Sequence, residues 1–464
     1  MDDRRNDVDT WLQARIDPLP PPPGTFELIK RRARRRKLRR VAATASAAAA
    51  VIAAIVVVPQ MTSVLHVTQN QGSAAANGSA ASPGSRGAMS VSSGPNHTAS
   101  PASAGTGSTG TPPVPADFAA GSVTFVGLGT GWVMGQAGAP GQACATQYCT
   151  SIARTDNAGK SWYGVHAPVT GSPAGGSGVS QIRFLNTRDG WAFGPALYAT
   201  VDGGQTWAQV PTGGRRVVDL ETVGDRAFAV LATCGGTGSD FAAECTSFSL
   251  EEATAGSNAW SPVSVPVTSF GDNGQASSAA LVLTSSRGYL LAPGGALYSG
   301  PVDGSGAWQQ VSTGTSNGAP CGPGTAQADG QPSTGMLAAA GPSSLVLACG
   351  LQQAGTGIYT STDGGQTWQQ QASVPGGDGT VTSVAAQPGG EIVVATTGGI
   401  AVSHDDGSSW QQATVSGAPA SGFSYVGMTS PQQGVAVPAD PTVEHAIWFT
   451  FDGGLTWQPS PIRS

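Results

Sequence analysis

The distribution of apolar residues divides the chain into four parts. An uncharged run from Val41 to Val58, VAATASAAAAVIAAIVVV, directly follows the basic stretch RRARRRKLRR at 31–40. From about Asn70 to Ala116 large apolar residues are almost absent, and Ser, Ala, Gly, Pro and Thr dominate. From 117 to 464 short apolar segments alternate with Gly-rich polar turns, the pattern of β-strands joined by tight turns. The expected parts are therefore a basic segment (1–40), an apolar helix (41–58), a flexible linker (59–116) and a β domain (117–464).

The apolar run has the length of a membrane-spanning helix. At about 1.5 Å per residue it covers roughly 27 Å, close to the roughly 30 Å hydrocarbon core of a bilayer. The basic residues before it predict a cytoplasmic N-terminus and an extracytoplasmic β domain. A cleaved signal peptide is the alternative, but a basic region of this length is unusual for one, and no clear Ala-x-Ala site follows Val58. The prediction is a single-pass type II protein of the plasma membrane.

A tryptophan recurs through the β domain at intervals of 42 to 60 residues, a period typical of propeller blades. The sequence around it also recurs, as TVDGGQTW (200–207), STDGGQTW (361–368), SHDDGSSW (403–410) and TFDGGLTW (450–457). An earlier copy, TDNAGKSW (155–162), has Asn157 in the Asp position. Two copies are degraded: PVDGSGAW (301–308) keeps Asp303 and Trp308, and ATAGSNAW (253–260) keeps only its tryptophan.

A second recurring pattern precedes the tryptophan motif. It is an apolar strand, a polar turn and then Gly-aromatic-apolar, as in VTFVGLGTGWVMG (123–135), IRFLNTRDGWAFG (182–194) and LVLTSSRGYLLA (281–292). With a third strand before the motif and a fourth after it, each unit predicts a four-stranded antiparallel blade. Seven units fit between Ser122 and Ile462, so the predicted fold is an all-β, seven-bladed propeller. Tyr289 occupies the position of Trp132 and Trp191, which favours core packing over a catalytic phenol.

The tryptophan motif resembles the Asp-box, Ser/Thr-x-Asp-x-Gly-x-Thr-Trp, of BNR-repeat propellers, which include sialidase-like, sortilin-like and photosystem II assembly-factor-like proteins. The resemblance covers roughly residues 120–462. It implies that the motifs hold turns at the outside of the ring, away from the usual ligand face. We expect each Asp to accept backbone N–H bonds, Gly to take a positive φ, and the tryptophans, Trp368 among them, to be largely buried. The structural Asp-box residues are Asn157, Trp162, Asp202, Trp207, Asp303, Trp308, Asp363, Trp368, Asp405, Trp410, Asp452 and Trp457.

Composition and charge limit the classes of function that the sequence supports. Gly (67) and Pro (33) are abundant among the 464 residues, as a turn-rich fold requires. Residues 1–40 hold 12 Lys/Arg against 6 Asp/Glu, whereas the rest holds 10 against 22, so the positive charge is local and no nucleic-acid partner is expected. The segment PPPGTFELIKRRARRRK (21–37) is similar to juxtamembrane leaders of actinobacterial-type single-pass membrane proteins.

All six cysteines follow the apolar run, where an oxidising compartment favours disulfides. Their clustering favours the pairs Cys144–Cys149, Cys234–Cys245 and Cys321–Cys349. No Cys-x-x-Cys or paired His accompanies them, so neither a metal site nor another cofactor is predicted.

The sequence assigns no catalytic residue. Candidate ligand-binding residues on or near the inner strands are Arg183, Arg215, Asp219 and Arg287. Each has a structural alternative, because such arginines often bond sheet carbonyls or face solvent. Asp219 and Glu221 stand two apart on one strand and so share a face.

The expected function is an extracytoplasmic binding or scaffold module for a glycan, a peptide or a partner protein. Two alternatives remain: a sialidase-like glycoside hydrolase, and a transmembrane regulator that couples the propeller to the cytoplasmic segment. The resemblance to sialidases implies three carboxylate-binding arginines and an Arg-Ile-Pro motif in the first blade. Here the first inner strand reads SVTFVG (122–127), and no such motif occurs.

Overall fold

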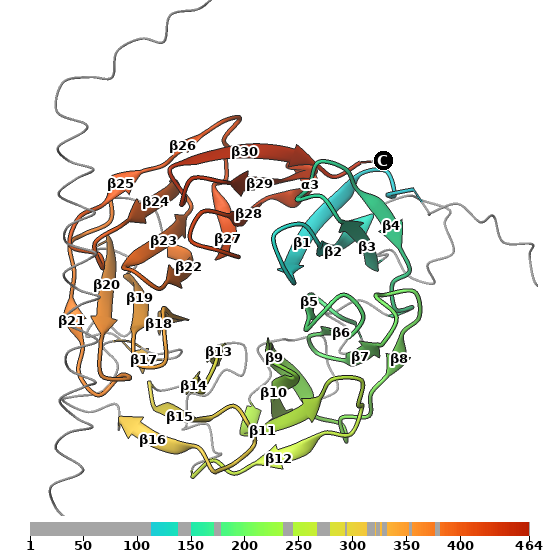
Figure 1. Cartoon of the computed structure of the whole chain (residues 1–464), viewed down its shortest axis with the longest axis horizontal. Coiled ribbons are helices and arrows are strands. Elements are labelled where there is room, and N and C mark those ends of the chain that lie inside the picture. Colours follow the sequence, from blue (N-terminus) through green and yellow to red (C-terminus); the bar gives the residue numbers. More distant parts are fainter. Residues whose placement is uncertain are drawn as a thin grey trace, which may run out of the picture. The chain divides into compact units, whose positions relative to one another are not determined.

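The computed structural model describes residues 113–137, 150–170, 178–234, 245–266, 279–292, 295–312, 321, 325–326, 332–351, 355–375 and 381–463. They form seven β-sheets arranged as the blades of a propeller, as the sequence predicted (Figure 1). The predicted segments 1–40 and 41–58, and the linker up to residue 112, lie outside these ranges. Within them, no helix is both long and apolar enough to span a bilayer.

Each blade is an antiparallel sheet whose consecutive strands run from the axis outward. Blades 1 to 3 consist of β1 (Phe118–Phe125), β2 (Gly131–Ala137), β3 (Thr150–Thr155) and β4 (Tyr163–Val165); β5 (Gln181–Phe184), β6 (Gly190–Phe193), β7 (Leu197–Thr200) and β8 (Ala208–Gln209); and β9 (Arg216–Val223), β10 (Arg226–Cys234), β11 (Cys245–Thr254) and β12 (Ser261–Val263).

The next three blades repeat this order, with one added short strand at the start of blade 5. Blades 4 to 6 consist of β13 (Ala280–Leu283), β14 (Arg287–Leu291), β15 (Leu297–Pro301) and β16 (Gln309–Ser312); β17 (Thr325–Ala326), β18 (Pro332–Ala339), β19 (Leu345–Leu351), β20 (Gly355–Ser361) and β21 (Gln369–Gln370); and β22 (Val381–Gln387), β23 (Glu391–Thr396), β24 (Gly399–Ser403) and β25 (Gln411–Gln412).

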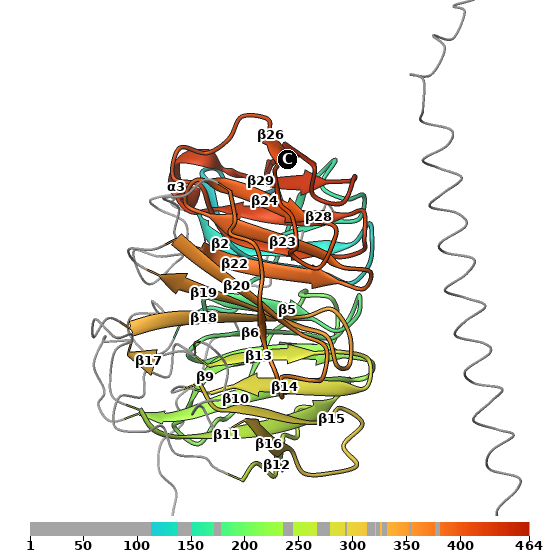
Figure 2. The ribbon, with the colours of Figure 1, turned by 90° about the vertical axis from the view of Figure 1, so that its left-hand side faces the viewer.

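Blade 7 completes the ring, which is seen from the side in Figure 2. It consists of β27 (Phe423–Met428), β28 (Gly434–Pro438), β29 (Ala446–Thr450) and β30 (Thr456–Pro461), with the one-turn helix α3 (Pro441–Glu444) between β28 and β29. A fifth strand, β26 (Thr414–Val415), pairs in parallel with β30. Since β26 directly follows the outer strand of blade 6, it ties that blade to blade 7.

The ring closes without strand exchange between the described strands of blades 1 and 7. Instead, the Gln433 amide of blade 7 donates to the Leu128 carbonyl of blade 1 at 2.7 Å, and the Trp162 indole donates to the Ser460 hydroxyl at 3.1 Å. Val114, which the sequence placed in the linker, is 8% exposed and joins the apolar cluster shared by both blades together with Ile462. Side-chain packing therefore closes the ring.

The Asp-boxes fix the turn between the third and fourth strands. In blade 5 the Asp363 carboxylate accepts the Thr367 N–H at 2.9 Å and the Thr367 hydroxyl at 2.6 Å, while the Ser361 hydroxyl accepts the Gly365 N–H at 2.8 Å. Equivalent bonds surround Asp202, Asp405 and Asp452. In blade 1 the Asn157 amide oxygen accepts the Ser161 N–H at 2.9 Å. The degraded box of blade 4 keeps one such bond, from the Ser305 N–H to Asp303.

In most blades the box turn is also hydrogen-bonded to the first turn of the same blade. Because successive strands are antiparallel, the first and third turns of every blade lie on one face of the ring, here called the Asp-box face. A backbone N–H of the box donates to a carbonyl of the first turn in six blades: Ala158 to Gly129, Gly203 to Arg188, Ala255 to Asp225, Gly364 to Ser343, Asp406 to Gly390 and Gly453 to Gln432.

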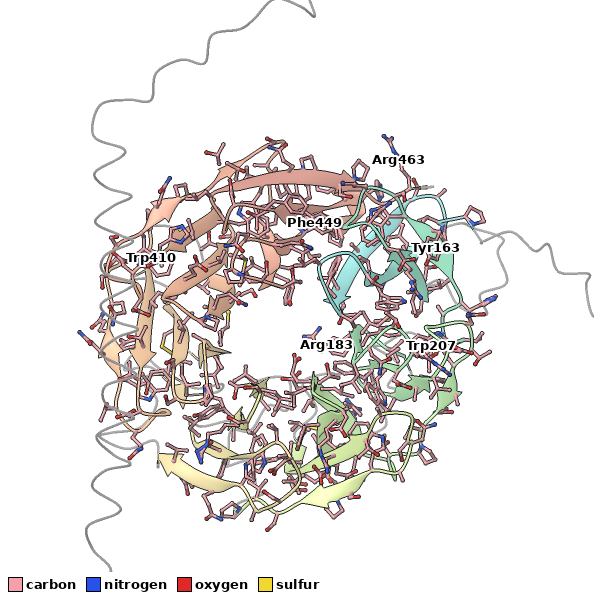
Figure 3. The ribbon with its side chains drawn as sticks, viewed as in Figure 1. Tyr163, Arg183, Trp207, Trp410, Phe449 and Arg463 are labelled. Atoms are coloured by element: carbon pink, nitrogen blue, oxygen red, sulfur yellow. A yellow bond between two sulfur atoms is a disulfide. The ribbon has the colours of Figure 1, made fainter. Side chains whose placement is uncertain are left out.

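Trp207 and Trp410 lie at the boundary with the preceding blade, near the rim of the ring (Figure 3). The Trp207 indole donates to the His166 carbonyl and the Trp410 indole to the Ala372 carbonyl, each at the end of the preceding outer strand. One ring face therefore remains near solvent, and Trp207, Trp260, Trp368 and Trp410 are only half-buried. Trp368, which was expected to be largely buried, is partly buried against the core, whereas Trp162, Trp308 and Trp457 are fully buried.

We expect Asp363→Ala to lower the free energy of unfolding by about 1–2 kcal/mol, because it removes a charged acceptor of three hydrogen bonds near solvent. Asp363→Asn is the matched control, since in blade 1 the Asn157 amide accepts the Ser161 N–H and donates to the Ser161 hydroxyl. Hydrogen bonds from Thr367 lower the pKa of Asp363 to about 2. Its stabilisation is present above the unfolded pKa near 4 and is lost as pH falls towards 2. Urea unfolding at pH 6 and pH 2.5 should show a smaller deficit for Asp363→Ala at the lower pH.

Candidate functional site

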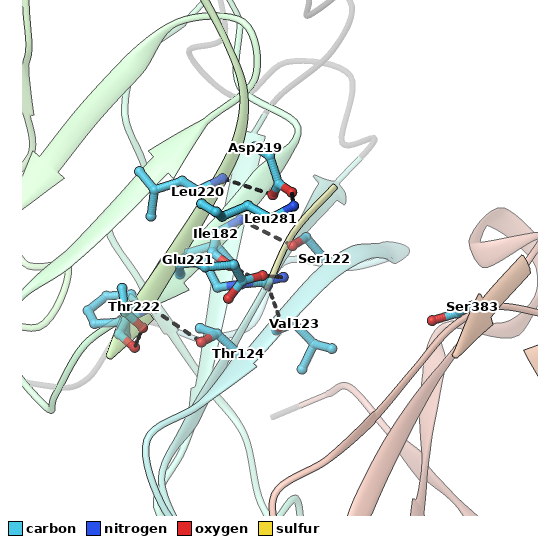
Figure 4. Close-up of polar contacts among 12 residues, drawn as sticks. Ser122, Val123, Thr124, Ile182, Asp219, Leu220, Glu221, Thr222, Leu281 and Ser383 are labelled. Carbon is cyan, nitrogen blue, oxygen red and sulfur yellow. Dashed lines mark hydrogen bonds and ion pairs between the residues drawn. The ribbon is translucent and has the colours of Figure 1, made fainter. Parts of the chain in front are cut away.

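Polar side chains on the inner strands connect neighbouring blades around the axis by hydrogen bonds. The Ser122 hydroxyl of β1 accepts the Ile182 N–H of β5 at 3.1 Å, and the Thr124 hydroxyl accepts the Phe184 N–H at 3.2 Å. Across the ring, the Thr382 hydroxyl of β22 donates to the Phe423 carbonyl of β27. These contacts, some of which appear in Figure 4, hold the inner strands in a fixed relation and so shape the centre of the ring.

Arg183 projects from β5 into the centre of the ring (Figure 3). Its guanidinium binds the Glu221 carboxylate of β9 through Nε at 3.0 Å and Nη2 at 2.7 Å. Its Nη1 donates to the carbonyls of Val123 at 3.4 Å and Ile182 at 3.2 Å. Burial alone would lower the pKa of Arg183, but the charge of Glu221 outweighs this and raises it. Arg183 thus joins blades 1, 2 and 3 with a permanently charged group.

Asp219 lies two residues before Glu221 on β9. Its carboxylate accepts the Leu281 N–H of β13 and the N–H of Leu220, both at 2.8 Å, and so links blade 3 to blade 4 (Figure 4). Burial and the charge of Glu221 raise the pKa of Asp219 to about 7, although both N–H bonds favour its ionised form. Two carboxylates therefore share a single guanidinium here.

A pocket of about 480 Å³ adjoins the Arg183–Glu221 pair. Its walls are the ends and first turns of β1, β5, β9 and β27, so it lies on the Asp-box face rather than on the opposite face that the resemblance implied. Hydroxyls of Thr222, Tyr425 and Thr429 line it, with the Phe125 ring and the backbone of Val126 and Gly127 beside them. Burial raises the pKa of Tyr425, so its phenol stays protonated at neutral pH. We call this cavity the channel pocket.

The other candidate residues lie elsewhere. Arg215 precedes β9 and pairs with Glu251 of β11, and it also donates to the Ser249 hydroxyl at 2.8 Å, so it braces blade 3. Arg287 begins β14 and lines a second pocket of about 330 Å³ between blades 4 and 5. The Tyr289 hydroxyl donates to the Pro342 carbonyl, and its ring is 1% exposed within the core, in agreement with the packing role expected for it.

Arg183, Arg215 and Arg287 consequently do not converge. Of the arginines on described residues, Arg183 alone lines the channel pocket. A carboxylate-binding set of three arginines is therefore not formed by these candidates. Arg216, also on β9, is separated from Glu221 by five residues, or about 16 Å of strand.

Tyr425 was missed from the sequence, because it stands outside the repeat positions that bring polar groups to the pocket in the other blades. By strand register the segments VTF (123–125), IRF (182–184), LET (220–222) and VGM (426–428) are equivalent. The first position is a buried apolar residue in all four, and the second holds Thr124, Arg183, Glu221 or Gly427. Tyr425 comes one residue earlier, where blade 1 has Ser122.

The disulfides lie toward the face opposite the Asp-boxes. Cys234 at the end of β10 bonds Cys245 at the start of β11, and Cys321 bonds Cys349 of β19, which confirms two of the predicted pairs. Cys144 and Cys149 lie outside the described residues. Where side chains are described, no cluster of three metal-ligating residues occurs.

Comparison with known proteins decides the repeat type. Residues 359–370, which contain the Asp363 turn, match the family model for the BNR/Asp-box repeat. The protein is a β-propeller that contains Asp-box repeats. No curated protein matches the sequence.

Solved structures similar to this Asp-box propeller are distant from it in sequence. A structure of YCF48 bound to D1 peptide is 16% identical, with 74% of this chain and 96% of that chain covered and a TM-score of 0.46. A GH74 enzyme from Niastella koreensis is 12% identical, with 75% and 66% covered and a TM-score of 0.37. The extracellular domain of a putative one-component system from B. thetaiotaomicron is 10% identical, with 75% and 40% covered and a TM-score of 0.44. Likenesses at this level concern the propeller fold alone.

Proposed function

We propose that this Asp-box propeller is a membrane-anchored, extracytoplasmic binding module whose ligand enters the channel pocket. The observation that carries the proposal is the pocket itself, because four blades contribute to its walls, which include Tyr425 and the Arg183–Glu221 ion pair. Ligand sites typically combine a preformed concavity of about 300–1,000 Å³ with a few convergent polar groups. The anchor at 41–58 and the outward orientation rest on the sequence, where the basic stretch precedes the apolar run.

Binding without turnover is the chemistry that the pocket supports best. Hydrolysis of a glycoside usually needs one carboxylic acid and one carboxylate placed on either side of the scissile bond. Here Glu221 is held by Arg183, and both oxygens of Asp219 accept backbone N–H groups that join two blades. Both carboxylates therefore have structural partners.

The test uses the full chain purified in mild detergent and presented to a glycan array and to an immobilised peptide library. The variant is Tyr425→Phe, because Tyr425 lines the pocket and the exchange removes only its hydroxyl. We expect it to weaken binding roughly fivefold, the loss of one hydrogen bond of about 1 kcal/mol, with an unchanged melting temperature.

Tyr359→Phe, on β20 and outside the pocket, is the matched control and should bind as the wild type does. Arg287→Gln tests the second pocket. Binding that depends on Arg287 and is indifferent to Tyr425 would show that the ligand site lies between blades 4 and 5, against the proposal.

A further inference from the structure

The inner strands carry little charge, and most of it lies beside the channel pocket. On their described residues the charged side chains are Arg183, Arg216, Asp219 and Glu221, and Arg216 stands at the far end of β9. One guanidinium thus stands beside two carboxylates at this end of the channel, of which Glu221 lines the pocket and Asp219, with its pKa raised to about 7, is partly ionised at neutral pH. Across from them, the residues of β13, β22 and β27 bring no charged side chain.

The single arginine has little capacity left for a ligand. Three of its nitrogen atoms already donate to Glu221, Val123 and Ile182. An anionic group entering the pocket would have to displace Glu221 and would remain close to Asp219, and such like-charge contacts cost several kcal/mol by rough estimate. An ammonium or guanidinium group would instead supply the missing positive charge. The pocket therefore favours cationic ligands.

An apolar surface lies next to the pocket. Among described residues, four large hydrophobic side chains are exposed: Leu128, Val169, Val201 and Phe451. Leu128 follows the pocket-lining Gly127, and its carbonyl is bonded to Gln433 of blade 7. The pocket residue Phe125 contacts Phe449 edge-on at 5.6 Å, and Phe449 stacks with Phe451 at 6.0 Å. Leu128 and Phe451, 57% and 55% exposed, form what we call the apolar shelf.

We propose that the ligand of the channel pocket is a polypeptide segment of a partner protein that carries a lysine or arginine beside a large apolar residue. The basic side chain enters the pocket towards Glu221, and the apolar side chain covers the shelf of Leu128 and Phe451. The inference rests on the proposed function, since it specifies the chemistry of that site. A neutral glycan would satisfy the hydroxyls of the pocket but would leave both the charge imbalance and the shelf unused.

The test measures the affinity of the full chain in detergent for capped fluorescent hexapeptides Gly-Gly-X-Z-Gly-Gly, by anisotropy. X is Lys, Arg, Gln or Glu, and Z is Gly, Ser, Leu or Phe. We expect Lys or Arg at X to bind about tenfold more tightly than Gln, and Glu to bind least, as one new close charge pair allows. Leu or Phe at Z should bind about fivefold more tightly than Gly, through burial of apolar area on the shelf.

Variants assign each preference to its residues. Glu221→Gln should reduce the Lys-to-Gln ratio to near one and leave the preference at Z. Leu128→Ser combined with Phe451→Ser should remove the preference at Z and leave that at X. Val169→Ser is the matched control, because Val169 is exposed but follows β4, away from the Asp-box face.

Salt dependence keeps the test decisive if Glu221→Gln does not fold. The affinity of Lys peptides for the wild type should fall between 50 and 500 mM NaCl, whereas that of Gln peptides should stay constant, since screening weakens charge pairs selectively. Tighter binding of Glu peptides, or a Lys preference that survives Glu221→Gln, would overturn the inference. Glycan binding that depends on Tyr425, with no peptide bound, would also overturn it but would leave the binding module intact. Absence of both would contradict both proposals.

Discussion

Trp132→Ala is expected to lower the free energy of unfolding by about 3–5 kcal/mol, the usual cost of truncating a buried tryptophan. The side chain is fully buried at the boundary of blades 1 and 2, where it stacks on Phe184 with ring centroids 3.8 Å apart. Its indole donates to the Gly203 carbonyl in the Asp-box of blade 2 at 3.2 Å, and the Arg154 guanidinium covers its ring at 4.8 Å. Alanine would leave a cavity between two blades and remove the partner of the Gly203 carbonyl.

Urea unfolding followed by circular dichroism measures the loss. Trp207→Ala is the matched control, because Trp207 meets the other edge of Phe184 at the same boundary but is only half-buried. It should cost roughly half as much, in proportion to the apolar area that it removes from water. Equal losses for the two variants would contradict the expectation that the buried Trp132 stabilises the fold more than the half-buried Trp207 does.

Loss of the Cys321–Cys349 disulfide is the other large effect expected. The bond closes a loop with a sequence separation of 28, so chain entropy alone predicts a stabilisation of about 3.5 kcal/mol. For Cys234–Cys245, with a separation of 11, the same relation gives about 3 kcal/mol. Both members of the longer bond are buried, so alanine is the suitable replacement because it places no hydroxyl in the core.

The double variant Cys321→Ala/Cys349→Ala should unfold at a lower urea concentration than the wild type. Reductant provides the control. It should lower the urea midpoint of the wild type more than that of the variant, because the variant already lacks the Cys321–Cys349 bond. A variant as stable as the wild type under oxidising conditions would show that this bond does not constrain the unfolded chain.

The fold was predictable because its determinants are local and repeated. A box such as STDGGQTW contains the acceptor, the positive-φ glycines and the first residues of the next strand within eight positions, and φ is indeed +75° at Gly364 and +90° at Gly365. Repetition then predicts the number of blades. Even the degraded box of blade 4 keeps Trp308 buried, although there the ring packs onto Gly288 and Gly300 of its own blade.

The candidate site was predictable only in part, because it is assembled from residues far apart in sequence. Arg183 and Asp219 were selected from inner strands, and both lie beside the channel. Arg215 stands outside β9 by a single residue, which suffices to direct it to Glu251 instead. Tyr425 meets Arg183 only because blade 7 closes against blade 1, and no local pattern states which polar positions the closed ring brings together.

Closure by side-chain contacts, without strand exchange, also determines how the ends of the ring are connected. The first and last core residues of the described propeller, Val114 and Ile462, belong to one apolar cluster, and every blade is made of strands consecutive in sequence. The two ends therefore meet at an ordinary blade boundary, not at a sheet that both complete. A circular permutant, with these ends joined and the chain opened between two other blades, would keep all seven sheets intact. Which blade comes first in the sequence therefore does not affect the arrangement of the seven sheets.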